Sequence, residues 1–193
     1  MVGNKAQILN LQGGVELHEK ILKDLGLEVN KIKLPGDIDF DACITIFPGG
    51  ESTVISKLIQ KFDLFEPLQK LIKSDKWIFG TCAGAILLAS DLTTNPQKIQ
   101  QFKAVDVTVE RNSYGSQVFS KESELVFLKD QSMKAAYIRA PKFLDIGSEV
   151  EVLAVEKNSK EAAVLKQENV IISNCNPELE GNTTINEYMI NDN

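Results

Sequence analysis

A short segment around a cysteine constrains the fold of this chain most strongly. The apolar run Trp77–Phe79 leads into Gly80-Thr81-Cys82-Ala83-Gly84, and a helix-like run over residues 83–89 follows. Small residues around a cysteine between a strand and a helix are typical of a nucleophile elbow, in which a strained turn holds the side chain outward. The helix N-terminus is expected to lower the pKa of the thiol and to offer backbone N–H groups, such as that of Ala83, to an oxyanion. A buried structural cysteine is the alternative, and the flanking glycines weigh against it.

Strand-like and helix-like segments alternate in the first part of the chain. This βαβ alternation predicts an α/β fold with a doubly wound, mostly parallel sheet flanked by helices, of the flavodoxin-like kind. The expected strands are residues 7–11, 28–33, 42–47 and 77–79, and the helix-length segments between them are residues 15–25 and 54–74.

Farther along, strand-like runs follow one another without a long helix between them. Their succession predicts antiparallel strands that are added to the sheet before residues 170–173 rejoin it. These runs are residues 102–109, 124–128, 135–138, 150–155 and 162–166. Residues 183–189 predict a short final helix.

Composition excludes several classes of protein. The 193 residues fit a single domain, residues 1–193, and neither a linker nor a repeat divides them. A net charge of −6, without a basic stripe, argues against nucleic acid as a partner. The start of the chain lacks a signal-peptide pattern, and no apolar run approaches about 18 residues, so a cytoplasmic protein without a membrane segment is expected. Three cysteines without a Cys-x-x-Cys spacing predict neither a disulfide framework nor a metal site.

Four loops with unusual composition follow the expected parallel strands. In an open α/β sheet the carboxyl ends of such strands meet at one rim, where ligands bind. In Pro48-Gly49-Gly50-Glu51-Ser52-Thr53, two glycines let backbone amides turn toward a ligand before a helix cap. A tight turn without a ligand is the alternative for this segment. The loops are residues 11–14, 47–53, 80–84 and 176–178.

A cysteine nucleophile needs a base, and the chain contains a single histidine, His18. The apolar strand Val170–Ile172 runs into Asn174-Cys175-Asn176-Pro177-Glu178, where a His-x-Glu pair would complete a Cys-His-Glu triad. An asparagine amide cannot take up a proton near neutral pH, so Asn176 cannot replace imidazole as a general base.

The motifs together resemble the class I, triad-type glutamine amidotransferases over nearly the full length of the chain. Within that family they are most similar to the glutaminase subunits of pyridoxal 5′-phosphate synthases, which serve vitamin B6 synthesis. The segments that carry the resemblance are Leu11-Gln12-Gly13 with His18, Pro48-Gly49-Gly50-Glu51-Ser52-Thr53, Gly80-Thr81-Cys82-Ala83-Gly84, Arg111-Asn112-Ser113-Tyr114-Gly115, Ile138-Arg139-Ala140-Pro141 and Pro177-Glu178-Leu179.

The resemblance implies a reaction without a cofactor. Cys82 would attack the side-chain amide of L-glutamine, giving a glutamyl thioester and ammonia, and Glu178 would orient the base. The resemblance also implies hetero-oligomerisation with a synthase subunit that forms a dodecameric core. Residues implied in substrate binding are Gly49, Gly50, Glu51, Ser52, Arg111, Ile138 and Arg139, and those implied in a partner-coupled oxyanion hole are Gln12, Gly50 and Ala83. The two arginines suit a carboxylate, and exposed ion pairs are their alternative role.

Three features depart from the family pattern: Asn176 at the triad histidine position, Ser116 after the Tyr-Gly pair, and a short C-terminal helix. The first predicts impaired hydrolysis with binding retained. Asn176 is compatible with a deliberate replacement and with a natural pseudo-glutaminase that binds glutamine or the synthase without turnover. A cysteine hydrolase acting on another amide is a remoter alternative. His18 is implied to be an interface or solvated helix residue, not a substitute base.

Overall fold

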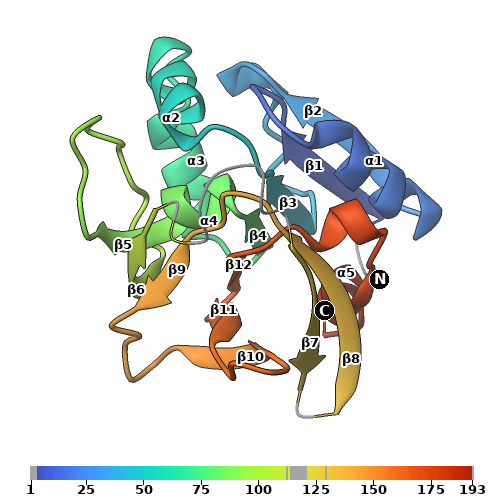
Figure 1. Ribbon diagram of the computed structural model, residues 1–193. Helices are drawn as coiled ribbons and strands as arrows, with labels where there is room; N and C mark the ends of the chain where they lie inside the picture. Colours follow the sequence, from blue (N-terminus) through green and yellow to red (C-terminus); the bar gives the residue numbers. More distant parts are fainter. Residues whose placement is uncertain (1–3, 112, 114–120, 129, 193) are drawn as a thin grey trace.

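A nine-stranded sheet forms the centre of the molecule (Figure 1). The computed structural model describes residues 4–111, 113, 121–128 and 130–192. Within the sheet the strands lie in the order β2-β1-β3-β4-β12-β11-β10-β7-β8. They are β1 (Lys5–Leu9), β2 (Glu28–Ile32), β3 (Ile44–Phe47), β4 (Trp77–Thr81), β7 (Lys121–Phe127), β8 (Gln131–Tyr137), β10 (Glu151–Glu156), β11 (Ala162–Gln167) and β12 (Val170–Ser173).

The strands from β2 to β12 in this order are parallel, and those from β12 to β8 pair antiparallel. Helical segments connect the parallel strands, as a doubly wound sheet requires. The predicted α/β architecture with added antiparallel strands is therefore confirmed. The helices are α1 (Val15–Asp24), η1 (Pro35–Asp37), α2 (Ser52–Lys61), α3 (Phe65–Ile72), α4 (Ala83–Leu88), η3 (Pro177–Glu180) and α5 (Thr184–Asn191).

Each central strand contributes to two hydrophobic cores, because successive side chains of a strand point to opposite faces. On one face Phe47 and Ile78 pack with α2, α3 and α4. On the other face Ile46 and Phe79 pack with α1 and α5. All four side chains are at most 1% exposed. Burial on both faces explains why these strands read as continuous apolar runs.

The segment of residues 54–74, expected as one helix-length element, forms two helices instead. The first ends at Lys61 and the second begins at Phe65. Between them Asp63 adopts φ 54°, in the left-handed region, which interrupts a right-handed helix. Pro67 could have indicated this break, because a proline is tolerated in the first turn of a helix and not in its interior.

A second, three-stranded sheet lies beside the helices of one face. It contains β5 (Ala89–Leu92), β6 (Val105–Glu110) and β9 (Lys142–Leu144). The prediction that residues 102–109 join the main sheet is therefore wrong. Phe102, just before β6, stacks on Phe65 of α3 with ring centroids 4.7 Å apart, so this segment packs on the helical layer. Neither β5 (Ala-Ser-Asp-Leu) nor β9 (Lys-Phe-Leu) has the continuous apolar run that marks β3 and β12.

The parallel strands bring the predicted loops to one end of the sheet, as Figure 1 shows around the ends of β1, β3 and β4. The turn after β4 depends on close packing of α4 against β3. A β-carbon added at Gly84 would lie 2.0 Å from the carbonyl oxygen of Phe47. Asn112, Tyr114, Gly115 and Ser116 lie outside the described residues. Among the helices that are described, none has the length and apolar character to cross a bilayer.

Gly84→Ala is expected to destabilise the protein by about 1–3 kcal/mol, the usual cost of overpacking a core. The loss should appear even though alanine favours an exposed helix by about 1 kcal/mol over glycine. Urea unfolding measures the change. Gly36→Ala is the matched control, because nothing lies within 4 Å of its added β-carbon. Equal unfolding midpoints for the two variants would contradict the tight contact between α4 and β3.

Candidate active site

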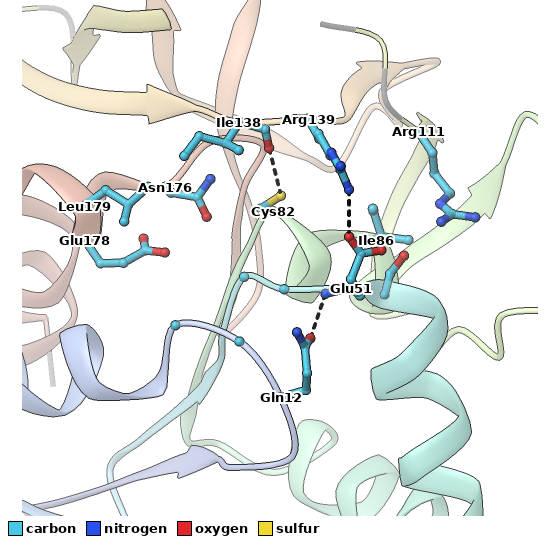
Figure 2. Close-up of a pocket in the computed structure, with 15 residues that line it drawn as sticks. Gln12, Glu51, Cys82, Ile86, Arg111, Ile138, Arg139, Asn176, Glu178 and Leu179 are labelled. Carbon is cyan, nitrogen blue, oxygen red and sulfur yellow. Dashed lines mark hydrogen bonds and ion pairs between the residues drawn. The ribbon is translucent and has the colours of Figure 1, made fainter. Parts of the chain in front are cut away.

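A cavity of about 260 Å³ opens where the loops after the parallel strands meet (Figure 2). The structure brings together here every site residue predicted from the sequence except Ala83, whose buried backbone N–H instead contacts the Cys82 thiol. The residues that line the cavity are Gln12, Gly13, Gly14, Gly49, Gly50, Glu51, Ser52, Cys82, Ile86, Arg111, Ile138, Arg139, Asn176, Glu178 and Leu179.

Cys82 occupies the turn between β4 and α4 with a strained backbone. Its φ is 47° and its ψ is −98°, a combination that residues other than glycine rarely adopt. The Cys82 N–H donates to the carbonyl of Ser173 on β12 at 2.8 Å, and its own carbonyl accepts from Ile86 N–H in the first turn of α4. Such a strained turn, anchored on both sides, is the geometry of a nucleophile elbow.

Burial, together with the negative charge of Glu178, raises the pKa of the Cys82 thiol to about 11. Hydrogen bonds from the Asn176 side chain and from Ala83 N–H oppose this shift without overcoming it. The expectation that the helix N-terminus would lower the thiol pKa is therefore wrong for this state of the site. At neutral pH the sulfur keeps its proton.

Asn176 and Glu178 point into the same cavity as Cys82 (Figure 2). Backbone hydrogen bonds in both directions between Asn176 and Ala136 fix the start of this segment next to β8. All three side chains converge on Gly49. A β-carbon on Gly49 would lie 2.5 Å from Asn176 Oδ1, 3.5 Å from Cys82 Cβ and 3.6 Å from Glu178 Oε1. A side chain at position 49 would therefore displace the amide of Asn176.

The loop after β1 holds the glycine turn in place. Gly14 N–H donates to the Gly49 carbonyl at 2.9 Å, and Glu51 N–H donates to Gln12 Oε1 at 2.7 Å. Gly13 has φ 109°, and a β-carbon there would lie 1.9 Å from the Gly49 oxygen. The orientation of the Gly49 carbonyl therefore depends on the loop that follows β1.

Both arginines lie at the rim of the cavity with partners (Figure 2). Arg139 pairs with Glu51 at 3.1 Å, and both side chains are about half exposed. Arg111 donates to Gln97 Oε1 at 2.9 Å and to Thr53 Oγ1 at 3.3 Å. Since an exposed ion pair contributes less than about 1 kcal/mol, Arg139 can exchange Glu51 for a ligand carboxylate at small cost.

His18 is not on the surface, so the prediction of an interface or solvated helix residue is wrong. It is 1% exposed, and its Nε2 lies 3.6 Å from Glu178 Oε1. The sequence could have indicated this burial. His18 lies three residues after the apolar Val15 and four before Leu22, and residues at this spacing share the buried face of a helix.

Four residues that line the cavity were given no role by the sequence analysis. Gly13 and Gly14 belong to the loop of residues 11–14 that was predicted at the rim, and Leu179 belongs to a segment that carries the family resemblance. Ile86 lies one helical turn after Cys82, and only that proximity could have indicated it. Across the part of the chain that the structure describes, no group of three or more His, Cys, Asp or Glu side chains could hold a metal ion.

Comparison with known proteins identifies the family. The model of the SNO glutamine amidotransferase family matches residues 8–193. The pyridoxal 5′-phosphate synthase subunit PdxT of Thermosipho africanus is 37% identical over 188 residues, covering 97% of each chain. The subunit of the same name from Francisella philomiragia is 37% identical over 184 residues, covering 95% of this chain and 96% of its own.

Solved structures agree with this result. A crystal structure of a glutamine amidotransferase superposes with a TM-score of 0.88 at 33% identity, covering 96% of this chain and 97% of its own. PurLQS from Thermotoga maritima has a TM-score of 0.70 at 15% identity, covering 96% and 92%, and supports the fold alone. The match over nearly the whole length, together with the cysteine elbow in its cavity, shows that the chain belongs to the SNO glutamine amidotransferase family.

Proposed function

We propose that this chain is the glutamine-hydrolysing subunit of a pyridoxal 5′-phosphate synthase, and that Asn176 impairs its chemistry. The observation that carries the proposal is Cys82 on a strained elbow, in one cavity with the Gly49–Gly50 turn and Glu178. The PdxT relatives match almost the whole chain, and their names support a pyridoxal 5′-phosphate synthase as the complex in which the chain acts. The chain acts as one domain without a cofactor, in the cytoplasm, and hands ammonia to a synthase with a dodecameric core.

The reaction follows from acyl transfer chemistry. Cys82 Sγ attacks the carbonyl carbon of the glutamine side-chain amide, and the C–N bond breaks to leave a glutamyl thioester. The thiol proton ends on the nitrogen, which departs as ammonia, and water then hydrolyses the thioester to glutamate. The backbone N–H groups of Gly50 and Ala83 stabilise the oxyanion.

The other polar groups at the rim hold the substrate. Arg111 and Arg139 bind the α-carboxylate of glutamine, because a guanidinium matches a carboxylate with two hydrogen bonds. Glu51 and Ser52 contact the amino-acid end, and the backbone of Ile138, whose carbonyl lies 3.9 Å from the Cys82 sulfur, lines the path of the side chain. Glu51 is free for this role once a ligand carboxylate takes its place on Arg139.

Asn176 occupies the position of the triad histidine and removes the step that moves the thiol proton. With a pKa of about 11, roughly one Cys82 thiol in 10⁴ is ionised at pH 7. An amide cannot accept that proton, so loss of the base costs about 10²–10⁴ in rate. Binding of glutamine does not need the base.

A non-catalytic pseudo-glutaminase is the second candidate function. It binds glutamine or the synthase without turnover. The observation in its favour is the thiol of Cys82, which stays protonated beside an amide and a carboxylate. The cavity and its glycine turn are complete enough for binding under either function.

The synthase subunit completes the oxyanion hole. In the isolated chain Gly14 N–H holds the Gly49 carbonyl, and reorientation of that peptide would turn an N–H group toward the substrate. The exposed apolar side chain of Leu179, at the rim of the cavity, supports a partner surface there.

Asn176→His is expected to raise glutaminase activity at least about 10²-fold in the presence of the synthase subunit. The imidazole would take the thiol proton while Glu178 holds its tautomer. Release of ammonia from glutamine measures the gain. Adding Cys82→Ala to the same chain should abolish it.

Two results would contradict this prediction in different ways. Turnover by the unmodified chain at about 1 s⁻¹ or more, an ordinary enzyme rate, would show that Asn176 does not impair it. An inactive Asn176→His variant that still binds glutamine in the complex would favour the pseudo-glutaminase.

Glutamine affinity is expected to rise at least about fivefold when the synthase subunit binds, because two sites that share a conformational change influence each other reciprocally. Calorimetric titration with and without the synthase subunit measures the two affinities. Both titrations use Cys82→Ala, so that turnover does not consume the ligand. Equal affinities would exclude a partner-completed oxyanion hole.

A further inference from the structure

Three polar side chains meet in a buried cluster beside the cavity. The proposed reaction uses one of them, Glu178, and gives no role to the other two. His18 comes from α1, Thr81 from β4 and Glu178 from η3, and they are at most 4% exposed. Nε2 of His18 lies 3.3 Å from Thr81 Oγ1 and 3.6 Å from Glu178 Oε1. We call these three residues the buried polar cluster. His18 Nδ1 is buried without a hydrogen-bond partner among the described residues, and a buried donor without an acceptor is costly, so the protons of this cluster can be assigned.

The Thr81 hydroxyl connects the other two members. It accepts a hydrogen bond from Gly49 N–H at 3.0 Å and donates its own proton to Glu178 Oε1 at 3.4 Å. His18 Nε2 then faces two acceptor oxygens and must carry a hydrogen. If Thr81 donated to His18 instead, Glu178 Oε1 would receive no proton from the cluster. A buried carboxylate without a donor is strongly unfavourable, so the first arrangement is favoured.

Glu178 has no lysine or arginine within ion-pair distance among the residues that the structure describes. His18 is the one basic side chain within ion-pair distance of its carboxylate there. Nor does Glu178 Oε2 have a hydrogen-bond partner within those residues, although it is buried. One oxygen of the carboxylate is therefore held by the buried polar cluster, and the other is left unsatisfied.

We propose that His18 is a positioning residue that acts through Glu178. By donating from Nε2, it fixes the carboxylate through Oε1, and so fixes the Glu178 side chain in the cavity that it shares with the side chain at position 176. Through Thr81 it also supports Gly49 N–H, and so the glycine turn of the cavity. Its consequence for catalysis rests on the proposed function, whereas the hydrogen-bond arrangement does not.

NMR spectroscopy of the chain without a histidine tag tests the arrangement directly. Because the chain contains a single histidine, its imidazole ¹⁵N signals need no assignment to a residue, and only Nε2 and Nδ1 have to be distinguished. We expect Nε2 to carry the hydrogen and Nδ1 to resonate as an unprotonated nitrogen. Glu178→Gln and Thr81→Val should each shift the Nε2 signal. Glu180→Gln, which changes a carboxylate two residues away outside the cluster, is the matched control.

An Nδ1–H tautomer in the unmodified protein would overturn the proposal. So would Nε2 signals that are the same in Glu178→Gln and Glu180→Gln. Thr81→Val provides a second perturbation if Glu178→Gln does not fold. These results require no glutaminase activity, so failure of the proposed function leaves them interpretable.

A second arm tests positioning in the Asn176→His background with the synthase subunit. His18→Leu is expected to lower kcat about tenfold with little change in KM, the usual size of effect when a supporting hydrogen bond is lost. His18→Gln should recover most of that loss, because its amide can donate from a similar place. Equal kcat for the leucine and glutamine variants, in proteins with matching unfolding curves, would overturn the positioning role. If the background itself lacks activity, the NMR arm alone decides.

Discussion

The turn at Cys82 is the constraint on which the rest of the site depends. Its positive φ is possible only because β12 holds the Cys82 N–H and α4 begins at once on the other side. That helix can start there because Gly84 lets it approach the Phe47 carbonyl of β3. The elbow in turn carries Thr81 and Cys82 to the same place, one facing the buried polar cluster and the other the cavity. A shift of α4 would therefore move the nucleophile and the support of Glu178 together.

Burial gives this site its electrostatic character. Removing the Cys82 thiol from water stabilises its protonated form, and the nearby charge of Glu178 adds to the effect. A triad of this type needs a group between sulfur and carboxylate that can become a cation when the sulfur becomes an anion. Asn176 hydrogen bonds to the thiol but stays neutral. When the thiol loses its proton, no positive charge therefore forms between the thiolate and the carboxylate of Glu178. The basic side chain that does lie within ion-pair distance of the carboxylate is His18, at 3.6 Å.

Much of the architecture was predictable because it depends on local patterns. Apolar runs such as Ile44–Phe47 mark strands buried on both faces, and the glycines around Cys82 mark a turn that few other sequences can adopt. The second sheet around β6 was not predictable in the same way. It depends on packing against segments distant in sequence, as the stacking of Phe102 on Phe65 illustrates.

The sequence by itself determined the α/β fold, the cysteine elbow, the glycine turn and the absence of an imidazole at position 176, since residue identity and short-range spacing are enough for each. Only the tertiary structure decided the ionisation of Cys82 and the place of His18. The pKa of a thiol depends on how deeply it is buried and on which charges lie near it. The contact between His18, Thr81 and Glu178 joins residues that are distant in sequence, and it exists only because α1, β4 and η3 pack together.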